Sequence, residues 1–216
     1  MPYAPDSYPR QIPQFKVHGR GEVTVSAKGI ITGDSNIPNN GADFGPDTMG
    51  GATTTGQHGA PYTATSGIGE ACNYIHSLGG GIVLFQNVGK IYSVTNSMTI
   101  YQDTTIDGSF STINFSPSTD SVLFSIAELS NPNHIIKNLT VNLSSAPSGG
   151  ITTVLIGTTM NKLPEYENIV INANSKAKNG FAFGNGSNTG CKDCVVNNVT
   201  KYAYNVSGGG TGVLSD

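Results

Sequence analysis

Three side chains suited to acid–base chemistry share one repeated position in the second half of the chain. Lys137, Glu167 and Asp193 each stand five residues before an asparagine. If those asparagines close equivalent strands, the three side chains line up on neighbouring strands, which lie about 4.8 Å apart in a sheet. Glu167 and Asp193 would then match the ~5–5.5 Å carboxyl separation that cleaves glycosidic bonds with retention, with Lys137 beside them as base or counter-charge. We treat them as a candidate catalytic group; the alternative is a row of charges on a solvated strand edge.

Other residue types suited to binding are few. Tyr166 is the aromatic residue that we expect to bind a ligand, because an aromatic ring can stack on a sugar. The CxxC spacing of Cys191 and Cys194 fits a redox pair or half of a zinc site. Zinc takes four ligands, no second CxxC exists and the four histidines are scattered, so we expect no metal site. The sequence leaves open whether these two cysteines are oxidised.

Composition restricts the class of protein. Only 12% of the 216 residues are charged and the net charge is −3, with no Lys/Arg run, which argues against a nucleic-acid partner. No apolar stretch approaches the ~20 residues of a membrane span, and no signal peptide is visible in this chain. The 28 glycines, together with abundant Asn, Thr, Ser and Val, indicate short strands joined by tight turns.

Two apolar strand motifs alternate along the chain from residue 105. The first recurs at 105–108, 139–142, 169–172 and 195–198, and the second at 123–126, 154–157, 181–184 and 202–205. A period of roughly 21–35 residues without a helix predicts an all-β solenoid. We therefore predict a parallel β-helix of about four or five coils, in which each strand pairs with its equivalent one coil later. Val141 then stacks on Ile171, and Ile156 on Phe183.

An asparagine column is expected at the end of the first motif. Asn tolerates a left-handed turn, bonds its own backbone, and can bond its equivalent on the next coil. The structural ladder predicted from the motif consists of Asp107, Asn142, Asn172 and Asn198.

The first third of the chain has a different organisation. Residues 1–61 hold seven of the eleven prolines, so residues 1–60 are predicted to be an extended arm preceding a solenoid domain at 61–216. Its best strand candidates are 22–26 and 29–32. The arm either docks on a partner or packs on its own domain. Apolar residues at helical spacing then predict one helix, with Ser66 as its N-cap, which we expect to cover the open end of the solenoid: Ile68, Ala71, Cys72, Ile75 and Leu78.

The order of these elements resembles a known family. The helix, Gly-Gly-Gly with an apolar strand at 79–85, Tyr-Ser-Val at 92–94, Met-Thr-Ile at 98–100 and Thr-Thr-Ile-Asp-Gly at 104–108 are similar to the opening of the pectin-lyase-like superfamily. The subgroup is that of pectate-lyase-3-type domains and phage tailspikes, and the resemblance covers about residues 61–208. It implies a right-handed parallel β-helix. It does not imply one activity, because the superfamily contains lyases, hydrolases, adhesins and viral attachment proteins.

The catalytic motifs of that superfamily are missing from the sequence. Family lyases use Arg or Lys as base, often with calcium held by carboxylates, but both arginines, Arg10 and Arg20, precede the solenoid. The NxD, DD, GHG and RxK motifs of galacturonase-type hydrolases do not occur. No cofactor is expected, and Ca²⁺ only if the chain is a lyase.

These observations favour a non-catalytic module, extracellular or on a cell or virion surface, for attachment or structural assembly, with glycan binding on a long lateral face. The rival is a polysaccharide lyase or glycoside hydrolase built on Lys137, Glu167 and Asp193. A flat, uncharged face would favour the first function and a deep groove lined by those residues the second. We also expect a homo-oligomer or assembly through the N-terminal arm and an uncapped C-terminal end.

Overall fold

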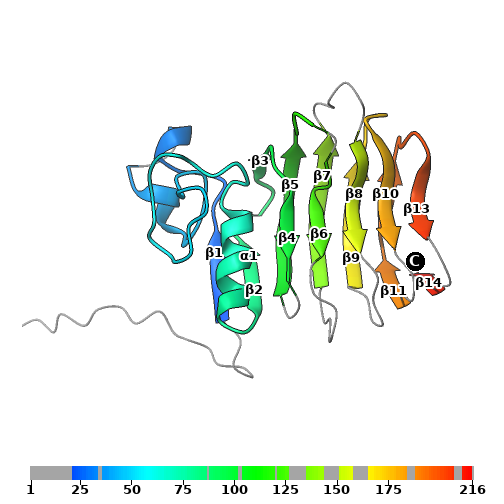
Figure 1. The fold of residues 1–216 in the computed structure, drawn as a ribbon, viewed down its shortest axis with the longest axis horizontal. Coiled ribbons are helices and arrows are strands. Elements are labelled where there is room, and N and C mark those ends of the chain that lie inside the picture. The colour runs from blue at the N-terminus through cyan, green and yellow to red at the C-terminus, as the bar shows by residue number, and fades with distance from the viewer. Residues whose placement is uncertain are drawn as a thin grey trace, which may run out of the picture.

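The protein is a parallel β-solenoid of about three turns, with one α-helix at its N-terminal end, in the residues that the structure describes (Figure 1). The computed structural model describes residues 21–33, 36–86, 88–101, 104–119, 121–126, 135–143, 151–157, 165–183, 188–206 and 211–215. Arg10 and Arg20 lie outside these residues.

The helices and strands follow one another in the order expected for a solenoid. Their bounds are β1 (Gly21–Val25), η1 (Ile30–Thr32), η2 (Pro38–Gly41), α1 (Ile68–Ser77), β2 (Gly81–Phe85), β3 (Ile91–Val94), β4 (Met98–Ile100), β5 (Thr104–Phe115), β6 (Phe124–Ile126), β7 (Ile135–Leu143), β8 (Ile151–Gly157), β9 (Glu165–Asn172), β10 (Ala177–Phe183), β11 (Asn188–Lys192), β12 (Val195–Asn197), β13 (Tyr202–Val206) and β14 (Thr211–Ser215).

The strands form two parallel sheets. One contains nine strands, in the order β1-β2-β5-β7-β9-β11-β14, with β3 beside β5 and β12 beside β9. The other contains five strands, in the order β13-β10-β8-β6-β4. Pairing of equivalent strands in successive coils confirms the predicted β-helix, whereas the structure shows about three turns in its described part against the four or five expected.

The larger sheet bends along its length, so that it presents two lateral faces. Asn138 in β7 and Asn168 in β9 have left-handed φ values of 55° and 54°, and Asp193 occupies the corresponding bend between β11 and β12 with 52°. We call the surface before the bend the charged face. It lies on β1, β2, β11 and the first halves of β5, β7 and β9. The surface after it, on β3, β12 and the segments 111–115, 139–143 and 169–172, is the amide face.

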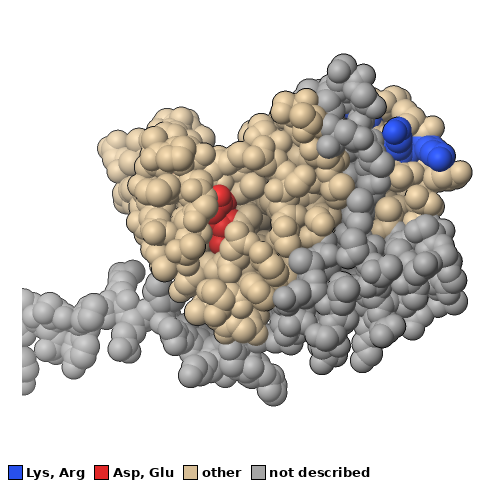
Figure 2. Space-filling model, in the orientation of Figure 1, with Lys and Arg blue, Asp and Glu red and all other residues tan. Residues whose placement is uncertain are grey.

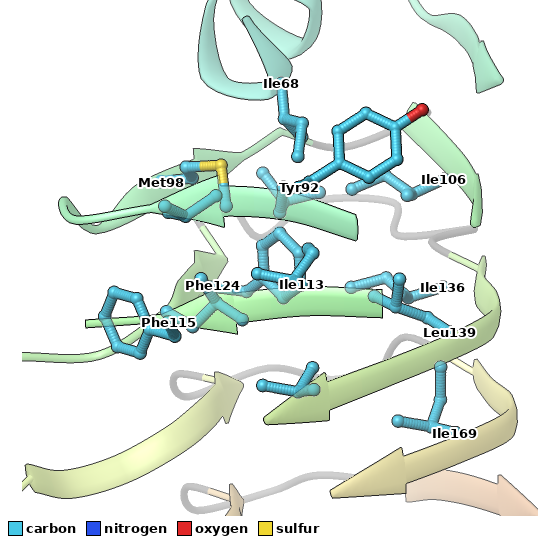
Figure 3. Packing of buried hydrophobic residues seen from close by; sticks show 14 of the residues in the cluster. Ile68, Tyr92, Met98, Ile106, Ile113, Phe115, Phe124, Ile136, Leu139 and Ile169 are labelled. Carbon is cyan, nitrogen blue, oxygen red and sulfur yellow. The ribbon is translucent and has the colours of Figure 1, made fainter. Parts of the chain in front are cut away.

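The core consists of columns of apolar side chains that alternate with outward polar ones. On the amide face Tyr92, Ile113, Val141 and Ile171 occupy equivalent positions in successive coils, and all are buried. Figure 3 shows Tyr92 and Ile113 stacked in this way. Full burial of one such aliphatic side chain contributes about 1.5–3 kcal/mol, so each added coil stabilises its neighbour. In the second sheet, however, Ile156 lies opposite Ala182, and Phe183 opposite Gly157, which corrects the expected Ile156–Phe183 stack.

Helix α1 forms where the apolar spacing predicted it. Ile68, Ala71, Cys72 and Ile75 are buried in the core, and Figure 3 shows Ile68 pointing toward the first coil. Leu78, which the same pattern placed on the buried stripe, is half-exposed.

The residue that caps α1 is Gly67 and not Ser66. Gly67 has φ 80°, and a Cβ there would lie 2.4 Å from the backbone nitrogen of Gly45, so only glycine fits. Ser66 instead donates its hydroxyl to the carbonyl oxygen of Ser93.

The segment before α1 is part of the same fold. β1 forms where a strand was expected and pairs with β2 as the first rung of the larger sheet. The second strand candidate, 29–32, is instead the short helix η1, because the carboxylate of Asp47 binds the N–H groups of Ile30 and Ile31. β1 therefore already has a strand of its own chain as its partner. No helix among the described residues is long and apolar enough to cross a membrane.

Candidate functional site

The candidate catalytic residues belong to a row of alternating charges on the charged face. Asp107, Lys137, Glu167 and Lys192 lie opposite one another on β5, β7, β9 and β11. The Nζ of Lys137 lies 3.4 Å from Oδ2 of Asp107, and the Nζ of Lys192 lies 3.0 Å from Oε1 of Glu167. We call this row the charge ladder. Its signs alternate, so each carboxylate has an ammonium group as neighbour and the row is electrically balanced.

Asp193 is not the neighbour of Glu167, which corrects the expected carboxylate pair. Lys192 occupies that position, and Asp193 is the exposed bend residue that follows it. The hydrogen bond to Glu167 raises the pKa of Lys192, with the charges of Glu167 and Asp193 acting in the same direction. Glu167 therefore lies beside a firmly protonated lysine, and the geometry of a two-carboxyl glycosidase is not formed at this place.

Tyr166 cannot stack on a ligand in this structure, which corrects its assignment. Its side chain is 1% exposed and its ring packs against Phe181, with centroids 5.1 Å apart and planes inclined at 48°. Burial raises its pKa well above the ordinary value for tyrosine. Tyr166 follows Ile136 in an inward column of the charged face and is a core residue.

The asparagine ladder exists, but two of its expected members belong elsewhere. Asn142 and Asn172 lie opposite each other, and the Nδ2 of Asn172 donates to Oδ1 of Asn142 at 2.7 Å. The next rung is Asn197 and not Asn198: its Nδ2 donates to Oδ1 of Asn172 at 3.0 Å. Asn114 lies opposite Asn142 at the other end. We call these four residues the amide ladder.

Asp107 begins a second ladder at the bend. It accepts a 3.1 Å hydrogen bond from Nδ2 of Asn138, whose Oδ1 in turn accepts one of 3.0 Å from Asn168. At the bend β5 has three residues, 108–110, where β7 has only Asn138. The predicted alignment of Asp107 with Asn142 fails because Asp107 lies before the bend and Asn142 lies after it. Asp107 therefore pairs with Lys137, half a strand before the position that was predicted for it.

The amide face carries no charged residue in any of its described strand segments. The outward column beside the amide ladder consists of Ile91, Thr112, Thr140, Val170 and Val195. The amides themselves are half-buried in the middle coils and exposed at Asn197. Figure 2, in the orientation of Figure 1, shows one side of the molecule, where few Asp, Glu, Lys or Arg side chains are seen among the described residues.

A cluster of exposed apolar side chains lies at the bend of the first coil, next to the amide face. Val88, Ile91 and Phe110 are 71%, 59% and 62% exposed. Their segments are adjacent, because the N–H of Gly89 donates to the carbonyl oxygen of Ser109 and Ile91 pairs with Thr112. We call these three residues the corner cluster. Sequence reasoning missed it, because the bend of β5, with its two extra residues, departs from the repeat.

Comparisons with known proteins give no family for this chain: no protein-family model, no curated protein and no solved structure matches it. Among the described residues, no three or more His, Cys, Asp or Glu side chains are grouped so as to hold a metal ion.

Proposed function

We propose that the protein is a non-catalytic module for attachment or structural assembly, and that its amide face binds an uncharged glycan chain. The observation that carries this proposal is the absence of charge from the five described strand segments of that face, beside a continuous row of amides. A neutral polysaccharide presents hydroxyl groups and no charge, so it needs no ion pair from its partner.

The amide ladder supports this proposal through its hydrogen-bonding capacity. A carboxamide has two N–H donors and an oxygen with two lone pairs. Each bond along the ladder uses one N–H of Asn172 or Asn197 and one lone pair of the amide that it meets. The remaining capacity recurs once per coil, at a spacing of about 4.8 Å, and suits a chain of sugar hydroxyls.

The corner cluster adds an apolar contact at one end of this row. Phe110 has φ 57°, a left-handed conformation that costs a residue with a Cβ about 1–2 kcal/mol. Its ring is mostly exposed and so gains little burial in compensation. Strain of this kind persists mainly at ligand sites, and an exposed aromatic ring can stack on the apolar side of a sugar ring.

The same proposal covers the family and the location of the protein. The order of elements from α1 to β5 supports a place near the pectin-lyase-like superfamily, in the subgroup of pectate-lyase-3-type domains and phage tailspikes. That analogy, together with the low charge, supports a location outside the cell or on a virion surface. It is an argument from fold and not from a site.

The rival function is a polysaccharide lyase or glycoside hydrolase, with Ca²⁺ in the case of a lyase. Its expected centre is Lys137, Glu167 and Asp193. The charge ladder argues against the enzyme function. Glu167 forms an ion pair with Lys192, and Asp193 occupies the bend and is not opposite Glu167.

One panel of soluble polysaccharides tests both functions, with binding and depolymerisation measured on the same samples. We expect the full chain to bind at least one neutral glycan and to release no product. Phe110→Ala should weaken that binding about tenfold, the value of one aromatic contact. Tyr202→Ala is the matched control, since Tyr202 is also an exposed aromatic but lies on β13 of the other sheet. Binding to no glycan would refute the glycan proposal, and product release would establish the enzyme.

Assembly is proposed to join the N-terminal arm of one molecule, through residues 1–20, to the end of the solenoid of another at β13, which lies at one end of the five-stranded sheet. A strand at such a position can pair with another chain through its backbone groups. Light scattering over a concentration series tests this proposal, with the full chain and a chain lacking residues 1–20. Loss of the oligomer on truncation would assign the contact to those residues. A monomer at every concentration in both cases would refute assembly.

A further inference from the structure

Two cysteines meet at the last described bend of the larger sheet. Cys191 lies in β11 and is buried, whereas Cys194 directly precedes β12 and is half-buried. Asp193 between them has φ 52°, which turns the chain, and both cysteines lie beside Tyr166: Cys191 is opposite Tyr166 in the sheet, and the Cys194 thiol donates to the Tyr166 carbonyl oxygen at 3.6 Å. We propose that Cys191 and Cys194 are a modification site, which closes to an intramolecular disulfide by exchange with a low-molecular-weight disulfide, with Cys194 as the attacking thiol.

Accessibility and electrostatics both assign the attacking role to Cys194. Cys194 is the more exposed residue of the two, and its backbone is held by the hydroxyl of Tyr204, which donates to the Cys194 carbonyl oxygen at 2.9 Å. The neighbouring Cys191 thiol lowers the pKa of Cys194, and backbone N–H groups act in the same direction, against the opposing effect of burial. The same interaction raises the pKa of Cys191, and burial raises it further. Since the thiolate is the nucleophile, Cys194 reacts first.

The exchange balances without any other reagent. The Cys194 thiolate attacks one sulfur of the external disulfide, forms a mixed disulfide and releases the first small thiolate, which takes up a proton. Cys191 then loses its proton, and its sulfur attacks that of Cys194 and displaces the second small thiol. Two protein thiols and one external disulfide thus become one protein disulfide and two small thiols, with two electrons passing to the external disulfide.

The second step joins two side chains that lie beside the same residue. Because Cys191 is opposite Tyr166 and the Cys194 thiol contacts the Tyr166 carbonyl oxygen, side-chain rotation can bring the two sulfur atoms to the ~2.05 Å of a disulfide. The bond would join the end of the charged face to the beginning of the amide face on one coil. It would therefore fix the bend at Asp193, on which the pairing of β11 and β12 with β9 depends.

Cys72 provides an internal comparison. It is fully buried on α1, and burial raises its pKa to about 12. We expect it neither to be alkylated in the native state nor to join the exchange.

The test treats the full-length native chain with oxidised glutathione and follows its intact mass. We expect the loss of two hydrogens in the wild type and in Cys72→Ser. Cys191→Ser should stop at a persistent glutathione adduct on Cys194, and Cys194→Ser should form neither product. In the reduced chain, iodoacetamide should label Cys194 at least ~10-fold faster than Cys191 or Cys72.

Two results would overturn the proposal. One is a wild-type chain that keeps the glutathione adduct, since Cys191 would then fail to resolve it. The other is faster labelling of Cys191 than of Cys194, with circular dichroism showing that the fold is intact. Neither result depends on glycan binding, so this experiment tests the inference independently of the proposed function.

Discussion

The Nδ2 of Asn172 lies 2.7 Å from Oδ1 of Asn142, one coil earlier in the solenoid. The same Asn172 accepts a hydrogen bond from Asn197 on the following coil, so its amide joins three coils. Leucine has nearly the same size but can make neither bond.

Asn172→Leu should therefore lower the free energy of unfolding by about 1–3 kcal/mol, because both neighbouring amides lose a partner. Denaturant titration followed by circular dichroism measures this loss. Lys178→Ala, on an exposed position of β10, is the control and should stay within about 0.5 kcal/mol. An equal loss in the two variants would mean that the amide ladder does not contribute to stability.

The sequence was sufficient for the architecture because the apolar columns repeat. Val141 and Ile171 are inward, buried and directly opposite each other, as their motif predicts. The register was harder to predict, because the segment 105–108 alternates polar and apolar residues just as 139–142 does. Periodicity alone cannot distinguish the two halves of a bent strand, and Asp107 was assigned to the wrong half.

A different signal would have given the correct register. A charged residue, then Asn or Asp, then a core residue recurs at 137–139, 167–169 and 192–194. The middle residue is the left-handed bend, a conformation that Asn and Asp tolerate better than most residues. Using this triplet as the anchor places Lys192, and not Asp193, beside Glu167. The turns formed by Asp47 could not be predicted in this way, because a carboxylate that binds distant backbone N–H groups leaves no periodic pattern.

Asp47 should make stability depend on acid pH. Its carboxylate is buried and accepts backbone N–H bonds of 2.8, 2.9 and 2.7 Å from Ile30, Ile31 and Asn39. Burial alone would raise its pKa, but these bonds and the charge of His58 lower it below the ordinary 3.8. The unfolded chain therefore takes up a proton first as the pH falls. The stabilisation is complete above the ordinary value and is lost as the pH falls from there through the lowered pKa.

Asp47→Asn should remove that pH dependence and cost about 1–3 kcal/mol at neutral pH, because an amide cannot accept all three bonds. Thermal unfolding between pH 2 and pH 7 measures both effects. Asp193→Asn is the matched control, since Asp193 is exposed and asparagine tolerates its left-handed bend. If the two variants had the same pH profile, the role assigned to Asp47 would be wrong.

Replacing Phe110 by glycine should stabilise the fold and weaken glycan binding. Phe110→Gly relieves the left-handed strain and removes a ring that is mostly exposed, so we expect the free energy of unfolding to rise by about 1 kcal/mol. Val88→Gly, at an equally exposed residue outside the left-handed region, should not stabilise the protein. A destabilised Phe110→Gly variant would show that the ring contributes to folding and is not held ready for a ligand.

The charge ladder gives a test of register, because reversing one charge should lower stability only if the signs of the row alternate. Glu167→Lys places three cations in a row on Lys137, residue 167 and Lys192, and like charges on neighbouring strands repel. We expect a small fall in the thermal midpoint, well below that of Asn172→Leu because the side chains are exposed. Adding Lys192→Glu should recover part of it, and high salt should remove the differences. If Asp193 were the neighbour instead, the new attraction to Asp193 would offset the new repulsion from Lys137, and the midpoint would hardly change. An unchanged midpoint, or a fall that salt does not diminish, would refute the alternating ladder.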